Sequence, residues 1–142
     1  MTSETITHSA EETIAYGRKL AGTLYPPLVV LLRGDLGAGK TTLVKGIAEG
    51  FGAARAEDVT SPTFTLVHEY RGPHTTLYHI DLYRIDTQRE LDTLGLDDLF
   101  APKCILLIEW GEKFSRLERD KDVEITLQRV GETERRIQQI TR

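Results

Sequence analysis

The sequence has little of several features that mark particular classes of protein. Its single cysteine, Cys104, excludes an internal disulfide and any multi-cysteine metal site. Its longest apolar run, residues 28–32, is far shorter than the roughly 18 apolar residues that cross a bilayer. The acidic, threonine-rich N-terminus lacks the charged and apolar regions of a signal peptide. We therefore expect a cytoplasmic protein that does not associate with membranes.

The sequence also lacks an excess of positive charge and any linker-like segment. It has 18 lysines and arginines against 22 aspartates and glutamates, so the net charge of −4 gives no global field that attracts nucleic acid. No stretch is rich in proline, glycine or serine, and 142 residues suffice for one domain with a real core. Asparagine is absent, which argues against the N-K-x-D element by which GTPases recognise guanine. The sequence predicts one domain over residues 1–142.

Apolar residues recur at helical intervals in several segments. Ser9 and Glu12 have the spacing of a capping box and precede the first of these segments. Asp86 is expected to cap the third helix. Gly52 is expected to end the second helix and Gly95 the third, because glycine is common just after the last helical residue. The expected helices cover residues 10–24, 44–51, 86–94 and 96–100.

Other segments are typical of strands. The uninterrupted apolar runs 28–32 and 104–108 indicate strands that are covered on both faces, as in a parallel sheet. Glycine and proline interrupt two later pairs of runs rich in β-branched and aromatic residues, which predicts two antiparallel hairpins. The expected strands cover residues 28–32, 63–70, 75–83, 104–108, 122–130 and 135–141. Together the elements predict an α/β fold, with a mostly parallel central sheet flanked by helices and with antiparallel hairpin additions.

A glycine-rich loop separates the first apolar strand from the second helix. Gly34, Gly39, Lys40 and Thr41 satisfy the pattern G-x-x-x-x-G-K-[ST], in the strand-to-helix context that this pattern requires. Proteins that bind nucleoside triphosphates use this element, the P-loop, to hold phosphate groups. The sequence therefore predicts a single-domain P-loop NTPase fold that binds ATP and Mg²⁺.

Each position of the loop has a physical reason. Small residues before the lysine let successive backbone N–H groups point at phosphate oxygens. Lys40 places a positive charge between the β- and γ-phosphates, and the Thr41 hydroxyl binds magnesium. Thr42 is expected to reach the α-phosphate through its backbone or its hydroxyl. The expected nucleotide contacts are Gly37, Ala38, Gly39, Lys40, Thr41 and Thr42.

Two carboxylates follow strand-like runs. Glu109 comes directly after four apolar residues, as in a Walker B element, and Asp81 ends the run LYHID. In a doubly wound sheet such groups lie at the carboxyl ends of strands, on the same edge as the loop. We expect Glu109 and Thr41 to bind magnesium, and Lys40, Asp81 and Glu109 to be catalytic residues. In the alternative, Glu109 leaves the core into solvent and Asp81 pairs with Arg84 at the surface.

Three hydroxyl residues, Thr60, Ser61 and Thr63, lie beyond the P-loop helix. Nucleotide-switch proteins often place a hydroxyl there that senses the γ-phosphate, and local turn hydrogen bonding around Pro62 is an equal alternative. Trp110, the only tryptophan, stacks on a partner, covers the site or simply lies at a half-buried strand end, and we favour the last alternative. The four histidines have no metal-ligand spacing, and we assign them no chemistry.

Four segments together resemble one known family. The strings GDLGAGKTT, SPTFTLVHEY, YHIDLYRI and ILLIEWGE closely resemble the bacterial TsaE family, formerly YjeE, of tRNA threonylcarbamoylation ATPases, and they occur in family order. The segment from Ser9 to Gly17 resembles the start of the family as well. Gly111 stands where family members often have proline, and the C-terminal hairpin is only loosely similar.

The resemblance implies an ATPase subunit that works with TsaD and TsaB in placing a threonylcarbamoyl group on adenosine 37 of tRNAs that read ANN codons. Such a chain powers or resets that complex and meets tRNA only indirectly. The resemblance also implies that Thr41 and Glu109 contact magnesium, that residues 37–42 hold ATP phosphates, and that Asp81 is a further active-site carboxylate. Two other functions stay open: a small-molecule P-loop kinase, and a module that binds nucleotide without turnover.

Overall fold

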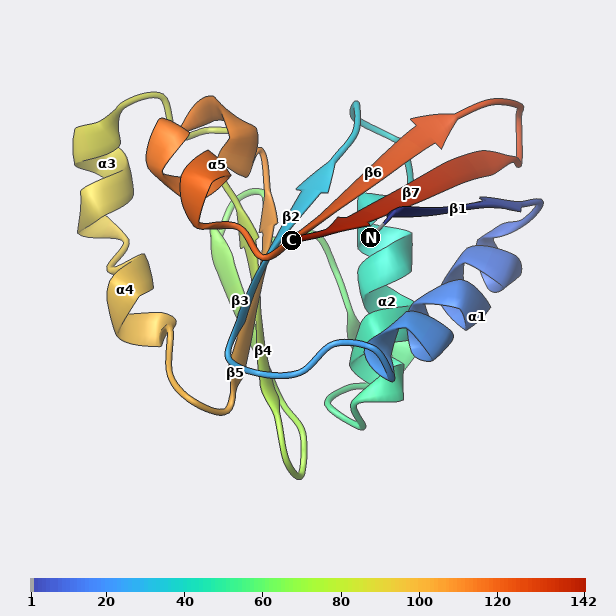
Figure 1. Cartoon of the computed structure of the whole chain (residues 1–142), viewed down its shortest axis with the longest axis horizontal. Coiled ribbons are helices and arrows are strands. Elements are labelled where there is room, and N and C mark those ends of the chain that lie inside the picture. The colour runs from blue at the N-terminus through green and yellow to red at the C-terminus, as the bar shows by residue number, and fades with distance from the viewer. Residues whose placement is uncertain (1) are drawn as a thin grey trace.

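The structure is one sheet with helices on both of its faces (Figure 1). A computed structural model describes residues 2–142 of the chain. The strands are β1 (Thr2–Thr7), β2 (Leu28–Arg33), β3 (Val67–Arg71), β4 (Thr76–Asp81), β5 (Cys104–Glu109), β6 (Val123–Arg129) and β7 (Arg135–Thr141). The helices are α1 (Ala10–Ala21), α2 (Lys40–Gly50), α3 (Gln88–Thr93), α4 (Leu96–Leu99) and α5 (Ser115–Asp120), with short 3-10 turns η1 (Ala56–Asp58) and η2 (Gly111–Lys113).

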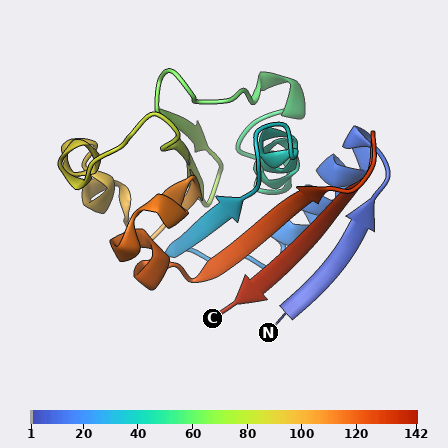
Figure 2. The same cartoon turned by 90° about the horizontal axis from the view of Figure 1, so that it is seen from above.

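The seven strands lie in the order β1-β7-β6-β2-β5-β4-β3. The four central strands are parallel, because β2 pairs with β5 and β6, and β4 pairs with β5. The outer pairings β3–β4, β6–β7 and β1–β7 are antiparallel. Figure 2 shows β1 beside β7, so the two ends of the chain meet at one edge of the sheet. The predicted α/β fold, with a parallel centre and antiparallel hairpins, is confirmed.

Alternation along the central strands divides the interior into two cores. Val30 and Leu32 of β2 belong to the core under α1 and α2, whereas Val29 and Leu31 belong to the core under α3, α4 and α5. Figure 1 shows these two groups of helices on opposite sides of the sheet. The uninterrupted apolar run of β2 is explained by this arrangement, because both faces of the strand are covered.

Helices α1 and α2 pack so closely that their backbones are in contact where they cross. A Cβ atom added to Gly46 would lie 2.1 Å from the carbonyl oxygen of Ile14, and one added to Gly17 would lie 2.6 Å from that of Leu43. Only glycine at both positions allows so close an approach. The crossing fixes α1 against α2, the helix that begins at the P-loop.

Several predicted boundaries are wrong. The first helix ends at Ala21 rather than at residue 24. The predicted helix was too long because Leu24 continues the apolar pattern, and it is buried although it lies beyond the helix. Thr87, not Asp86, caps α3 and forms a capping box with Glu90. Residues 63–66 form a turn instead of the start of a strand, and the N–H of Leu66 donates to the Pro62 carbonyl oxygen.

Two elements were not predicted. Strand β1 consists mostly of polar, exposed residues and is held by pairing with β7 at the other end of the chain. Helix α5 lies in the charged segment RLERD, which has no apolar stripe long enough to indicate a helix. The expected last strand is present as β7 with the predicted bounds. Within residues 2–142, no helix has the length and apolar character needed to span a membrane.

Candidate active site

The predicted site residues meet at one edge of the sheet. Strands β2, β4 and β5 end there, and the P-loop connects β2 to the start of α2. The register places Glu109 beside Leu32 of β2 and beside Asp81 of β4. One pocket at this edge is lined by Gly37, Gly39, Lys40, Thr41, Thr42, Asp81 and Glu109. The structure therefore brings together every predicted site residue except Ala38, which is buried and whose N–H donates to the Asp35 carbonyl.

The P-loop offers the start of α2 to this pocket. Gly37 and Gly39 have φ angles of 81° and 102°, in the left-handed region that favours glycine. Gly39 is the N-cap of α2 and supplies no side-chain hydrogen bond, and the first turn carries no acidic residue. The N-terminal N–H groups of this helix are thus not capped by a side chain, and the positive end of its dipole faces the pocket. This arrangement suits a phosphate group.

Lys40 is held at the base of the pocket. Its side chain is 5% exposed, and Nζ donates a 2.6 Å hydrogen bond to the Gly34 carbonyl oxygen. The same Nζ lies 3.7 Å from Glu109 Oε1 and 4.3 Å from the centre of the Trp110 ring. Trp110 therefore covers the lysine, and its ring also packs against that of Tyr83 at a centroid distance of 5.2 Å. The only tryptophan is part of the site.

Glu109 is buried between two nitrogen partners. It ends β5, where one carboxylate oxygen faces Lys40 and the other forms a 2.5 Å hydrogen bond with Nε2 of His79. His79 is fully buried, and its Nδ1 has no hydrogen-bond partner among residues 2–142. The expectation that Glu109 projects into the site rather than into solvent is met. His79 fixes one face of the carboxylate and leaves the other toward the P-loop.

Asp81 lies opposite Glu109 but has different partners. Its Oδ2 accepts a 2.9 Å hydrogen bond from the Thr63 hydroxyl, and its Oδ1 accepts a 2.9 Å hydrogen bond from the N–H of Tyr83. Asp81 is buried, and Arg84 instead lies over the ring of Phe64 at 5.1 Å. The alternative of a surface pair between Asp81 and Arg84 is therefore wrong.

The three loop hydroxyls separate into two groups. Ser61 and Thr63 line the pocket, and their hydroxyl oxygens are 2.7 Å apart. Thr60 does not line it, and its N–H donates to the hydroxyl of Tyr70. Burial raises the pKa of the Tyr70 phenol, which therefore stays protonated at neutral pH. The structure thus joins Ser61 and Thr63 to Asp81, while the Thr60 backbone is tied to β3.

The donor groups of the pocket fit a magnesium ion. Thr41, Asp81 and Glu109 supply a hydroxyl and carboxylates, the hard oxygen ligands that Mg²⁺ prefers. Within residues 2–142, no group of three or more histidine, cysteine, aspartate or glutamate side chains forms a metal cage. Mg²⁺ in phosphate-binding sites commonly uses one or two protein ligands and completes its shell with water and phosphate. The residues present match that mode.

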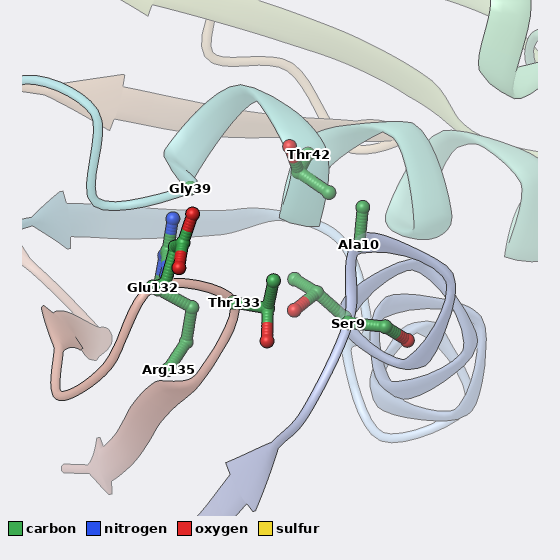
Figure 3. A pocket seen from close by; sticks show the side chains of 8 residues that line it. Ser9, Ala10, Gly39, Thr42, Glu132, Thr133 and Arg135 are labelled. Atoms are coloured by element: carbon green, nitrogen blue, oxygen red, sulfur yellow. The ribbon is translucent and has the colours of Figure 1, made fainter.

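A second pocket adjoins the first (Figure 3). Its walls come from the start of α1, at Ser9, Ala10 and Thr13, and from the β6–β7 hairpin, at Glu132 and Thr133. The two pockets share three lining residues, which are Gly39, Thr42 and Arg135. The site is therefore a bent groove that runs from the two carboxylates, past the P-loop, to the space between α1 and the hairpin.

Known proteins match the chain over most of its length. A family model described as "Threonylcarbamoyl adenosine biosynthesis protein TsaE" matches residues 7–137. The tRNA threonylcarbamoyladenosine biosynthesis protein TsaE of Bacillus subtilis is 41% identical over 131 residues, which cover 92% of this chain and 80% of the relative. The protein of the same name from Rickettsia bellii is 38% identical over 135 residues, with coverages of 95% and 92%. The chain belongs to the TsaE family.

A solved structure supports the same assignment. The crystal structure of Bacillus subtilis YdiB matches with a TM-score of 0.77 and 35% sequence identity, over 99% of this chain and 86% of that one. The TsaE fold described above is therefore shared along nearly the whole chain.

Sequence reasoning missed two residues of this TsaE site, His79 and Arg135. The signal for His79 was available, because Leu77, His79 and Asp81 alternate along β4 and therefore share one face of the strand. Leu77 packs in the core under α2, so a histidine between it and Asp81 also faces that side of the sheet. Arg135 gave no such signal. Its position at the P-loop depends on a hairpin far from the loop in sequence.

Proposed function

We propose that this chain is an ATP-binding and ATP-hydrolysing subunit that acts with TsaD and TsaB. In this proposal it is required for threonylcarbamoyl modification of adenosine 37 in tRNAs that read ANN codons. The relatives from Bacillus subtilis and Rickettsia bellii carry names that place them in tRNA threonylcarbamoyladenosine biosynthesis. One observation carries the hydrolytic part: Lys40 and Glu109 lie 3.7 Å apart in the pocket at the uncapped start of α2.

The residues divide the work of hydrolysis among them. The N–H groups of the P-loop and of the first turn of α2 hold the phosphates, and Lys40 neutralises charge on the β- and γ-phosphates. Thr41 and Glu109 hold Mg²⁺, which supplies further charge neutralisation when bound. Asp81, fixed by Thr63 and by the N–H of Tyr83, accepts a hydrogen bond from the attacking water. Trp110, against which Tyr83 packs, covers Lys40 and limits its access to bulk water.

Partner proteins, rather than this chain, carry the threonylcarbamoyl group in our proposal. The net charge of −4 disfavours direct binding of tRNA, which the chain meets only through the complex. The loop of Ser61 and Thr63 adjoins both the pocket and the exposed side chain of Phe64, which is 83% exposed. Because Thr63 donates a hydrogen bond to Asp81, hydrolysis at the site can change the conformation of this loop. A partner protein bound at the loop would then sense the change.

ATP hydrolysis by the chain alone and with purified TsaD and TsaB tests the proposal. We expect slow phosphate release by the chain alone and a clear rise when both partners are added. Lys40→Ala and Glu109→Ala should abolish the rise. If the partners leave turnover unchanged, or if Glu109→Ala hydrolyses ATP normally, the proposal is wrong.

The same assay separates the other two functions. Transfer of phosphate to a small acceptor would identify a kinase. A melting temperature that rises with ATP while turnover stays absent, even with both partners, would identify a module that only binds nucleotide.

A further inference from the structure

Arg135 is a half-buried arginine whose guanidinium forms no ion pair with any of residues 2–142. It is the first residue of β7, and its Nη1 donates to the carbonyl oxygens of Gly131 at 3.4 Å and of Glu134 at 3.0 Å. Its Nε and Nη2 have no hydrogen-bond partner among residues 2–142, and the guanidinium makes no ion pair there. Glu132 lines the same pocket without pairing with it. One side of the guanidinium is anchored, and the other is available to a ligand.

The unpaired side of Arg135 is close to the P-loop. A Cβ atom added to Gly39 would lie 3.6 Å from Arg135 Nε. In Figure 3 the side chain extends from the hairpin toward Gly39. A guanidinium offers several donors in a fixed plane and remains charged at any physiological pH, so it suits a phosphate oxygen. Its position beside the uncapped start of α2 adds a side-chain charge to a loop that otherwise binds through its backbone and Lys40.

The place of Arg135 in the groove indicates which phosphate it meets. Lys40, Asp81 and Glu109 line only the first pocket, which suits the phosphates that react and their magnesium. Ser9 and Thr133 line only the second pocket, which is the part of the groove left for the nucleoside. Arg135 and Thr42 line both pockets, at the bend between them. In a nucleotide that spans the groove, the bond between the α-phosphate and the ribose lies at this bend.

We propose that Arg135 binds the α-phosphate of the nucleotide and links the P-loop to the β6–β7 hairpin. This inference rests on the proposed ATP binding. Arg135 is then a binding residue that contributes equally to ATP and ADP and little to the chemical step. The anchored Nη1 fixes the guanidinium before the nucleotide arrives, so little side-chain freedom is lost on binding.

Calorimetric titration of Arg135→Gln with MgADP, MgATP and magnesium pyrophosphate tests the inference. We expect the Kd for ADP and for ATP to rise by a similar factor of about ten, because a charge-assisted hydrogen bond is lost. Pyrophosphate, which has no α-phosphate linked to ribose and is held at the P-loop, should bind within about two-fold of wild type. Arg135→Lys should recover part of the affinity, because it keeps the charge but loses the planar fork.

Arg136→Gln is the matched control. Arg136 is the next residue of β7 and faces the other side of the sheet, where it pairs with Glu4 at 3.0 Å and with Gln128. Its loss should leave all three affinities unchanged. Because Arg135→Gln also removes hairpin hydrogen bonds, the melting temperature of each variant is measured without nucleotide. A lower melting temperature with unchanged affinity for ADP would mean that Arg135 is only structural.

Two further outcomes would overturn the inference. If Arg135→Gln weakened the binding of ADP and of pyrophosphate equally, Arg135 would not contact the α-phosphate. If it weakened the binding of ATP alone, Arg135 would contact the γ-phosphate instead. If the wild-type chain binds none of the three ligands, the proposed ATP binding itself is wrong. That result is distinct from normal binding by wild type and Arg135→Gln alike, which would refute only the role of Arg135.

Discussion

The ends of β4 and β5 each carry one carboxylate, at paired positions of the sheet, yet the two serve different parts of the molecule. Glu109 is buried between Lys40 and His79 and therefore faces the P-loop. Asp81 accepts hydrogen bonds from Thr63 and from the N–H of Tyr83, and therefore faces the loop beyond η1. Equal positions in a sheet do not give equal roles. The partners supplied by neighbouring segments decide what each carboxylate does.

The largest expected effect is that of Glu109→Gln. The substitution keeps the shape of the side chain but removes the negative charge opposite Lys40 and replaces one carboxylate oxygen by an amide nitrogen, which cannot bind a metal ion. We expect partner-stimulated ATP hydrolysis to fall by a factor of roughly 100 or more, as is typical when a group that stabilises transition-state charge is lost. Phosphate release measured with TsaD and TsaB present checks this.

Asp86→Asn is the control for that measurement, because Asp86 is exposed and does not line the pocket. Retention of more than about a tenth of the wild-type rate by Glu109→Gln would show that the β5 end is not the centre of the chemistry.

The second largest effect is expected for Asp81→Asn. The amide oxygen can still accept from the N–H of Tyr83, and the hydroxyl of Thr63 can turn to accept from the amide nitrogen. The variant therefore removes charge while it keeps the contacts. We expect a fall of roughly 30-fold in turnover, less than the roughly 100-fold or more that a positioned acid–base group contributes because the side chain stays in place, and little change in ATP affinity. Single-turnover hydrolysis and nucleotide titration measure the two quantities separately. Equal losses for Asp81→Asn and Glu109→Gln would remove the distinction between the strand ends.

The sequence predicted the two carboxylates but not their partners. A carboxylate after an apolar run, beside a P-loop, is a local signal, and both Asp81 and Glu109 were found in this way. The contacts of Lys40 with Glu109 and of Thr63 with Asp81 join segments that are distant in sequence. They depend on the order of parallel strands in the sheet, which the sequence of each strand does not contain. The protein partners of each carboxylate were therefore beyond sequence reasoning.

The same limit explains which parts of the fold were predicted. The central strands have both faces covered, and their apolar runs are visible in any short window. Strand β1 has no such run, because it lies at the sheet edge and is stabilised by β7 at the far end of the chain. The pocket between α1 and the β6–β7 hairpin was missed for that reason too. It exists only because elements from both ends of the chain meet beside the P-loop.

The third largest effect is expected for substitutions of His79, the partner of the carboxylate at the end of β5. It acts as a positioning residue, because it is fully buried and holds Glu109 without lining the pocket. We expect His79→Leu to lower kcat about ten-fold, as loss of a group that orients a metal ligand commonly does, and to leave KM for ATP within about two-fold. His79→Gln, which can still donate a hydrogen bond to Glu109, should recover part of the rate. Loss of stability with normal kcat at a temperature where the variant is folded would reduce His79 to a core residue.

The smallest effect is expected for Thr63→Val, which removes the hydroxyl that Asp81 accepts from while it keeps the branched shape. A loss of about 1 kcal/mol in transition-state stabilisation would lower the rate roughly five-fold. Thr60→Val is the matched control, because Thr60 does not line the pocket and its link to Tyr70 runs through the backbone. If the hydroxyl acts through Asp81, Thr63→Val should have little further effect in an Asp81→Ala background, which lacks the group that Thr63 contacts, and a double-mutant cycle measures this coupling. Additive losses would mean that the loop meets the nucleotide independently of the β4 carboxylate.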